Sequence, residues 1–165
     1  FGIAVPAFSG MVTKTRNKMY VSDALKLISN AEYQFRKDNT LPKPTNNKCI
    51  VMSLVYLNNG VFDDAPNGGE YLRNKSFVVA VYNRSTNETE YYVRLVEDLG
   101  DGQYRGIDYK SKNQLNEDAG YNYTTNLKDS DLYGIAGNTN ILGKVQSKIS
   151  RCSSVYIYAP DSGEE

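Results

Sequence analysis

The sequence predicts an α+β fold in which a long N-terminal helix, residues 1–37, packs on an antiparallel β-sheet. Two patterns predict it. Apolar residues recur every three or four positions through 1–37, which is the helical period. Between residues 76 and 109, short runs rich in β-branched and aromatic residues alternate with turn residues. At 165 residues, we expect the chain (1–165) to form a single domain.

The N-terminal helix is predicted from an apolar stripe that is interrupted once, around Arg16. The stripe comprises Phe8, Val12, Tyr20, Ala24, Leu27, Ile28, Ala31 and Phe35. This spacing places the side chains on one face of an α-helix, with most basic residues on the other faces. Pro6 removes a backbone donor near the front, where we expect a kink or a locally melted turn.

The front of this helix carries more apolar sequence than the predicted sheet needs. The run from Phe1 to Phe8 is almost unbroken in its apolar character. It is too short to span a bilayer, which takes about 20 residues. We therefore expect it to be the end of a longer apolar segment.

Residues 38–75 are predicted to form a loop and a short second helix. Two prolines and three asparagines within 39–47 end the first helix. The segment 49–59 is rich in β-branched residues, which suits a strand, yet Met52, Val55 and Tyr56 share a helical face and Gly60 suits a helix C-cap. We favour the helix, with the strand as the alternative.

Residues 76–109 give the clearest β-signal, a three-stranded antiparallel meander. The first strand, 76–82, is apolar on both faces, as expected for a central strand. In the second, 89–97, Tyr91, Val93 and Leu95 alternate with more polar neighbours such as Arg94. A third strand follows at 103–109. The more apolar face of this sheet needs cover, and the stripe of the N-terminal helix is the expected partner.

The remainder, 110–165, is predicted to consist of variable loops and a last strand. Residues 110–140 are polar and irregular, with one helical turn expected at 129–133. The segment 141–149 is compatible with either helix or strand. Residues 153–159 alternate as a strand with Val155 and Ile157 inward.

The composition argues against an enzyme. The chain has no histidine, the commonest acid–base catalyst and metal ligand near neutral pH. Acidic pairs at 63–64, 97–98 and 117–118 lie in turn-like contexts, and we interpret them as surface residues. We expect no cofactor and no metal. Nineteen basic and nineteen acidic residues balance, so no global field favours nucleic acid, and we do not expect DNA as a partner.

The stretch Gly2-Ile3-Ala4-Val5-Pro6, followed by a long amphipathic helix, resembles the middle of the first helix of type IV pilins. The resemblance implies the pilin fold, a long helix packed on an antiparallel sheet. It also implies a truncated ectodomain whose precursor is held in the membrane by the segment before Phe1. The enrichment in Asn, Lys and Tyr favours a Gram-positive, for example clostridial, pilin.

The function that this resemblance implies is that of a structural subunit of an extracellular type IV pilus, serving adhesion, motility or biofilm formation. Its partners would be further copies of itself, the pilus assembly machinery and a host surface or glycan. The predicted filament interface comprises Phe1, Ile3, Val5, Pro6, Phe8, Met11 and Val12. Two alternatives remain open: a type II secretion pseudopilin, or a surface α+β module that binds glycans or other ligands through the Tyr- and Asn-rich loops at 110–140.

Cys49 and Cys152 are the two cysteines of the chain. In an exported protein, as the resemblance implies, an even count favours a disulfide. Two free buried thiols are the alternative. Their placement differs from that of the common Gram-negative pilins, in which both cysteines bracket a loop near the C terminus.

Overall fold

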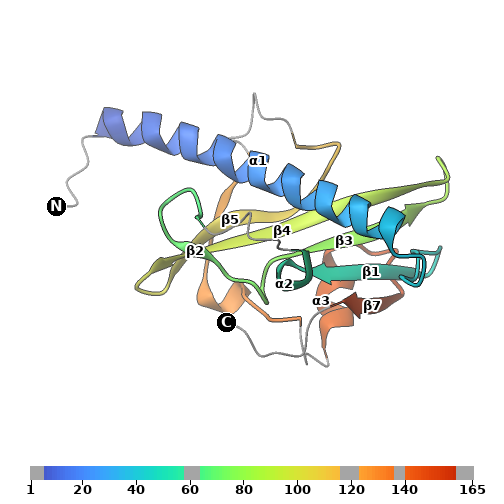
Figure 1. Ribbon diagram of the computed structural model, residues 1–165. Coiled ribbons are helices and arrows are strands. Elements are labelled where there is room, and N and C mark those ends of the chain that lie inside the picture. The colour runs from blue at the N-terminus through green and yellow to red at the C-terminus, as the bar shows by residue number, and fades with distance from the viewer. Residues whose placement is uncertain (1–5, 58–63, 116–122, 136–139, 159–165) are drawn as a thin grey trace.

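The computed structural model describes residues 6–57, 64–115, 123–135 and 140–158, with side chains from Lys14 onward (Figure 1). The chain forms three α-helices, one short 3-10 helix and seven strands within these ranges. In order they are α1 (Pro6–Lys37), β1 (Lys48–Ser53), α2 (Leu54–Leu57), β2 (Glu70–Tyr71), β3 (Phe77–Asn83), β4 (Glu88–Gly100), β5 (Gln103–Ser111), β6 (Thr125–Leu127), the 3-10 helix η2 (Asp129–Asp131), α3 (Ile141–Lys148) and β7 (Ser154–Tyr158).

The strands form one sheet in the order β6-β5-β4-β3-β1-β7, with β2 paired to β4. The predicted meander is confirmed as β3, β4 and β5, which pair antiparallel. The sheet is larger than the predicted three strands because β1 and β7 extend it on one side and β6 on the other. β1 and β7 are parallel, the one parallel pairing among the described strands.

The predicted helix from 49 to 59 is wrong over most of its length. Lys48–Ser53 is strand β1, hydrogen-bonded to β3 on one side and to β7 on the other. Its β-branched residues suit a strand covered on both faces, and this tertiary pairing outweighs the helical spacing. The helix is reduced to the single turn α2, which begins where the Ser53 Oγ accepts a hydrogen bond from the Val55 amide. Gly60 and Asn59 lie outside the described residues.

One face of the sheet is covered by α1, as predicted. The stripe residues Tyr20, Ala24, Leu27, Ile28 and Ala31 are fully buried, and Phe35 packs against the same cluster. The sheet contributes alternate residues to this cluster: Ile50 and Met52, Val78 and Ala80, Tyr91, Val93 and Leu95. The alternation predicted for the second strand is therefore confirmed.

The opposite face is covered by α3 and the chain on either side of it. Ile141, Val145 and Ile149 pack on Val51, Phe77, Val79 and Val81, which alternate with the residues facing α1. Helix, rather than strand, is thus the structure of 141–148. The last strand is confirmed as β7, with Val155 and Ile157 packed against this second cluster.

Cys49 and Cys152 are joined by a disulfide, which confirms the predicted pairing. It links β1 to the segment just before β7, and both cysteines are buried in the second cluster. In the part of the chain that the structure describes, no helix is both long and apolar enough to cross a bilayer.

Candidate functional site

The predicted filament interface lies at the front of α1. Phe1, Ile3 and Val5 lie outside the described residues. Pro6, Phe8, Met11 and Val12 belong to the first turns of α1, where the helical backbone is described but the side chains are not. Among the described side chains of α1, Lys14, Thr15 and Arg16 are exposed, and the first buried one is Asn17. Among the described side chains of α1, burial against the sheet therefore begins at Asn17.

A buried carboxylate fixes α1 at the start of this docked segment. Glu97 is 0% exposed, so its assignment to a surface turn is wrong. The Tyr20 hydroxyl donates to Glu97 Oε1 at 2.7 Å, and the Gly69 amide donates to Oε2 at 2.8 Å. The Asn67 amide also donates to the carboxylate, at 3.1 and 3.2 Å. We call Tyr20, Asn67, Gly69 and Glu97 the Glu97 anchor.

The anchor joins three parts of the chain: α1, the 64–69 loop and β4. The loop approaches so closely that a Cβ at Gly69 would lie 2.2 Å from the Asp98 carbonyl oxygen, so only glycine fits there. Asn67 also contacts α1, through its side-chain amide to the Tyr20 hydroxyl at 2.7 Å and through its Oδ1, which accepts from Arg16 at 2.9 Å. These bonds set both the rotation and the axial position of the helix.

Burial also shifts the acid–base properties of the groups around the anchor. It raises the pKa of the Tyr20 and Tyr71 hydroxyls well above the usual tyrosine range, so both remain donors. Tyr71 donates to Asp23 at 2.6 Å, and burial raises the pKa of that carboxyl despite the hydrogen bond. The cluster therefore acts as a fixed polar contact between helix and sheet.

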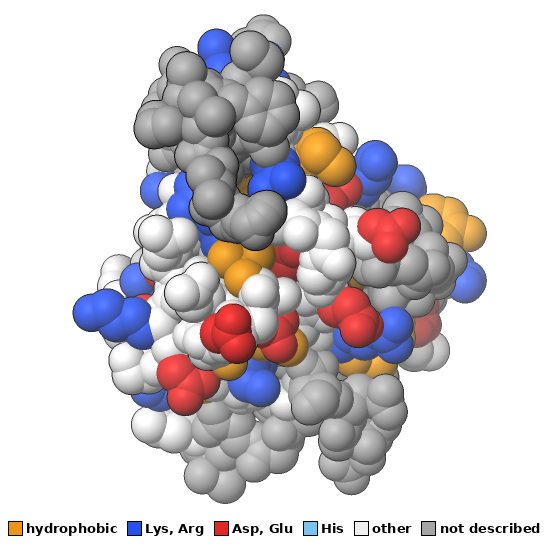
Figure 2. All heavy atoms as spheres, turned by 90° about the vertical axis from the view of Figure 1, so that its left-hand side faces the viewer, with side chains coloured by type: hydrophobic (Ala, Val, Ile, Leu, Met, Phe, Trp, Pro, Cys, Tyr) orange, Lys and Arg blue, Asp and Glu red, His pale blue; other side chains and the backbone are white. Residues whose placement is uncertain are grey.

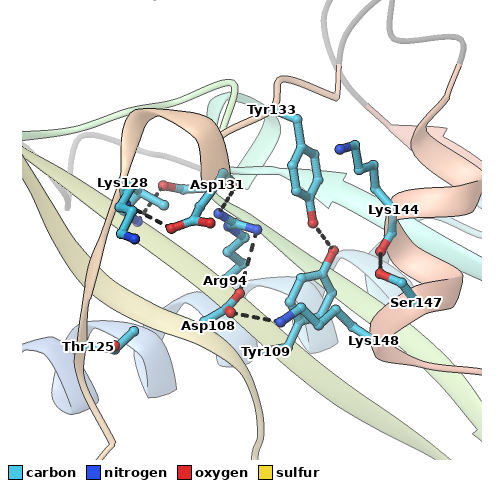
Figure 3. A network of polar contacts seen from close by, with 12 residues as sticks. Arg94, Asp108, Tyr109, Thr125, Lys128, Asp131, Tyr133, Lys144, Ser147 and Lys148 are labelled. Atoms are coloured by element: carbon cyan, nitrogen blue, oxygen red, sulfur yellow. Dashed lines mark hydrogen bonds and ion pairs between the residues drawn. The ribbon is translucent and has the colours of Figure 1, made fainter. Parts of the chain in front are cut away.

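The opposite face carries a cavity of about 380 Å³ between the sheet and α3. β4, β5, β6, the segment 129–133 and α3 supply its walls (Figure 3). We call it the cationic pocket. Its lining residues are Arg94, Asp108, Thr125, Asn126, Leu127, Ser130, Asp131, Tyr133, Lys144, Ser147 and Lys148.

Arg94 lies at the bottom of the cationic pocket, and its side chain is only 3% exposed. Its Nη2 donates to the Asp131 carbonyl oxygen at 2.7 Å. Its Nη1 lies 3.5 Å from Asp108 Oδ1. The guanidinium carbon also sits 4.6 Å from the ring centroid of Tyr133 and 6.0 Å from that of Tyr109. A buried cation is therefore held in one position from several sides.

Two lysines of α3 lie at the rim of the cationic pocket. Lys148 Nζ lies 3.1 Å from Asp108 Oδ2, so Asp108 is shared between Lys148 and Arg94. Lys144 Nζ lies 5.4 Å from the Tyr133 ring centroid, and no described carboxylate is within ion-pair distance of it. The two lysines are four residues apart, which brings their side chains to the same face of the helix (Figure 3).

Two tyrosines support the pocket from the second hydrophobic cluster. The Tyr109 and Tyr133 hydroxyls are hydrogen-bonded at 2.7 Å. Burial, together with the neighbouring Tyr133, raises the pKa of Tyr109 well above the usual range. This pair holds the Tyr133 ring between Arg94 and Lys144 (Figure 3).

The sequence predictions found only part of these two sites. The alternation of β4 placed position 97 on the face of Tyr91, Val93 and Leu95, and this was the signal that Glu97 is buried. For the cationic pocket, the predicted binding loops at 110–140 supply Thr125 to Tyr133, but Arg94, Asp108 and α3 were not associated with them. The described residues include no cluster of three or more acidic or cysteine side chains suited to a metal.

Comparisons with protein-family models, with curated protein sequences and with solved structures find no match to this chain.

Proposed function

We propose that this chain is the ectodomain of a structural subunit of a type IV pilus, a filament displayed outside the cell. The observation that carries the proposal is the length of α1 before its first buried side chain among the described residues. The helix begins at Pro6, and its described buried positions begin at Asn17. At 1.5 Å per residue, about 16 Å of helix precedes the docked segment. In Figure 1 this front part extends past the end of the sheet.

The sequence of the front part supports helix-to-helix contact between subunits. Phe8, Met11 and Val12 are apolar and lie within the helical segment before Asn17. Apolar side chains on such a segment are stabilised by removal from water, at roughly 25 cal/mol per Å². Copies of the same helix offer that cover. Contacts repeated head to tail do not close on themselves, so they produce a filament and not a ring.

The Glu97 anchor supports the same proposal from the docked side. A filament subunit must present its helix in one fixed orientation, because every subunit repeats the same contact. Tyr20 and Asn67 hold α1 to β4 at the first turns of the docked segment. The projecting front is thus carried on a helix whose rotation is set by the globular part.

The surface around the emerging helix is of mixed charge. Figure 2, which faces the side where α1 begins, shows acidic and basic side chains interspersed and few hydrophobic ones. Exposed Lys14, Arg16 and Lys18 on α1 would meet acidic side chains of neighbouring subunits. The disulfide agrees with an extracellular location, since such bonds persist in oxidising compartments.

Val12→Glu tests the proposal in the intact gene product, expressed with the pilus assembly machinery. We expect filaments to be lost, because each Glu would place a charge in the apolar filament core. We expect the folded domain to keep its melting temperature, because position 12 precedes Asn17, the first buried side chain among the described ones of α1. The matched control is Thr86→Glu, at an exposed position of the β3–β4 turn. Normal filament yield from Val12→Glu, or equal losses from both variants, would contradict the proposal.

A type II secretion pseudopilin is the nearest alternative, since it uses the same helix. Expression with either machinery separates the two: a pilin gives long filaments that can be sheared from cells, whereas a pseudopilin supports protein secretion. A second candidate role, ligand binding at the surface, is favoured by the cationic pocket.

A further inference from the structure

We propose that the cationic pocket binds an acidic sugar, whose carboxylate is held by Lys144 and Lys148 above Arg94. This binding activity is independent of filament assembly, because the pocket and α1 lie on opposite faces of the sheet.

The charge of the pocket favours an anion. Three cationic and two acidic side chains line it, so the formal balance is 3 − 2 = +1. Both acids are engaged by the protein itself. Asp108 contacts Arg94 and Lys148, and Asp131 Oδ2 accepts from the Lys128 amide at 2.8 Å. Lys144 is left as a cation facing only the Tyr133 ring among the described residues.

The ion pairing inside the pocket is incomplete. Arg94 Nε and Asp108 Oδ1 are buried, and neither has a hydrogen-bond partner among the described residues. The 3.5 Å separation of Arg94 and Asp108 is a charge contact without a hydrogen bond. Buried polar groups in folded proteins are normally satisfied, so Arg94 Nε favours an acceptor and Asp108 Oδ1 favours a donor such as a sugar hydroxyl.

Lys148 is able to serve both Asp108 and a ligand. Its side chain is 46% exposed, and an exposed ion pair contributes little, about 0–1 kcal/mol. Turning the ammonium from Asp108 toward a ligand carboxylate therefore costs little. Arg94, by contrast, is held by Asp131 and two tyrosine rings, so the bottom of the pocket is preorganised.

The remaining lining residues favour a sugar over other anions. Thr125, Ser130 and Ser147 bring hydroxyls, which match the hydroxyl groups of a saccharide. Leu127 is the one aliphatic residue among the lining residues. The Tyr133 ring already lies between Arg94 and Lys144, so it offers no free face to a nucleobase. About 380 Å³ lies at the lower end of the range for small-molecule sites.

The test is titration of the isolated chain with defined monosaccharides, followed by calorimetry and by amide chemical shifts. The probes are glucuronate and N-acetylneuraminate as carboxylated sugars, glucose 1-phosphate as a phosphorylated sugar and glucose as the neutral control. We expect saturable, salt-sensitive binding of a carboxylated sugar, with shifts in the residues of α3 and 125–133, and no binding of glucose.

Variants assign the binding to the pocket. Lys144→Ala and Lys148→Ala change exposed side chains, so the fold should be kept. Contacts of exposed ammonium groups are individually weak, so we expect each single variant to weaken binding modestly and the Lys144→Ala/Lys148→Ala double variant to weaken it about tenfold. Lys43→Ala, on an exposed loop outside the pocket, is the matched control and should bind as the wild type does. Arg94→Lys, which keeps the charge but not the fork, should weaken binding without abolishing it.

Three outcomes would overturn the proposal. These are no saturable binding of either carboxylated sugar, binding of glucose 1-phosphate alone, or unchanged affinity in the Lys144→Ala/Lys148→Ala double variant. The second outcome would reassign the pocket to phosphate esters. None of them depends on whether filaments form.

Discussion

The two faces of the sheet are built differently, and we propose that one serves assembly and the other ligand binding. Among the described residues, the α1 face buries twenty side chains in its hydrophobic cluster and the α3 face buries eleven. The larger cluster is accompanied by polar contacts that hold the long helix, among them the Glu97 anchor and the Tyr71–Asp23 hydrogen bond. The smaller one is supported by a disulfide and leaves space for the cationic pocket. The face with more buried apolar side chains thus carries the long helix α1, and the face with fewer carries the cationic pocket.

The largest expected effect comes from removing the disulfide, which belongs to the α3 face. Cys49 and Cys152 are 103 residues apart, and a loop of that length corresponds to about 4.7 kcal/mol in the chain-entropy model. The double variant Cys49→Ala/Cys152→Ala should lose about that free energy of unfolding in denaturant titrations. Hydrogen exchange should accelerate most in β7 and α3. An equal acceleration in α1 would show that the faces do not differ as described.

Glu97→Gln tests the anchor of the α1 face. The carboxylate accepts from Tyr20, Asn67 and Gly69, and an amide would turn an NH₂ group toward some of these donors. Since hydrogen bonds to a charged group contribute about 1.5–3 kcal/mol, we expect a loss of about 3 kcal/mol in the free energy of unfolding. Asp98→Asn, at the adjacent position, is the control and should change stability by less than about 0.5 kcal/mol. Similar losses in both variants would contradict the anchor.

Alkaline unfolding compares the buried tyrosines of the two faces. The folded-state pKa values of Tyr20 and Tyr109 are raised above the unfolded value of about 10. Each therefore contributes stability that is fully present below pH 10 and is lost as the pH rises through the folded pKa. Between pH 10 and that folded pKa, each adds up to about 1.4 kcal/mol per pH unit to the fall of stability with pH. Tyr20→Phe and Tyr109→Phe should each remove that contribution from the slope of the free energy of unfolding against pH above pH 10. An unchanged slope in either variant would show that this tyrosine ionises without unfolding.

The smallest expected effect is that of Asp23 beside the anchor. Burial raises its folded-state pKa above the usual value near 4, so the stability linked to its protonated form is lost as the pH rises through the raised pKa. Asp23→Asn keeps an acceptor for the Tyr71 hydroxyl and removes this pH dependence. From pH 4 upward, the variant should gain stability relative to the wild type, by less than about 1 kcal/mol. A relative loss over the same range would mean that the charged carboxylate is stabilised by the fold.

The sequence predicted the elements of the fold that carry a local periodic pattern, and it did not predict features that depend on contacts between distant segments. The stripe of α1 and the alternation of Tyr91, Val93 and Leu95 are local periodicities. The alternation is confirmed, and so is the stripe from Tyr20 onward. The strand β1 was mistaken for a helix because its covering partners, β3 and β7, lie far away in the sequence. The partners of Arg94 lie in β5 and the 129–133 segment, and other walls of the pocket come from β6 and α3, so no local pattern indicated the pocket. The front of α1, on which the proposed function depends, lies outside the described side chains.

Cysteine accessibility at Val12 tests the central claim, that the front of α1 is buried between subunits. Val12→Cys and, as the control, Thr86→Cys are treated with a maleimide in sheared filaments and in the isolated domain. We predict that both cysteines react in the isolated domain, whereas only the one at position 86 reacts in filaments. Equal labelling of position 12 in both states would contradict the account, because a helix front exposed in the filament cannot be the contact that assembles it.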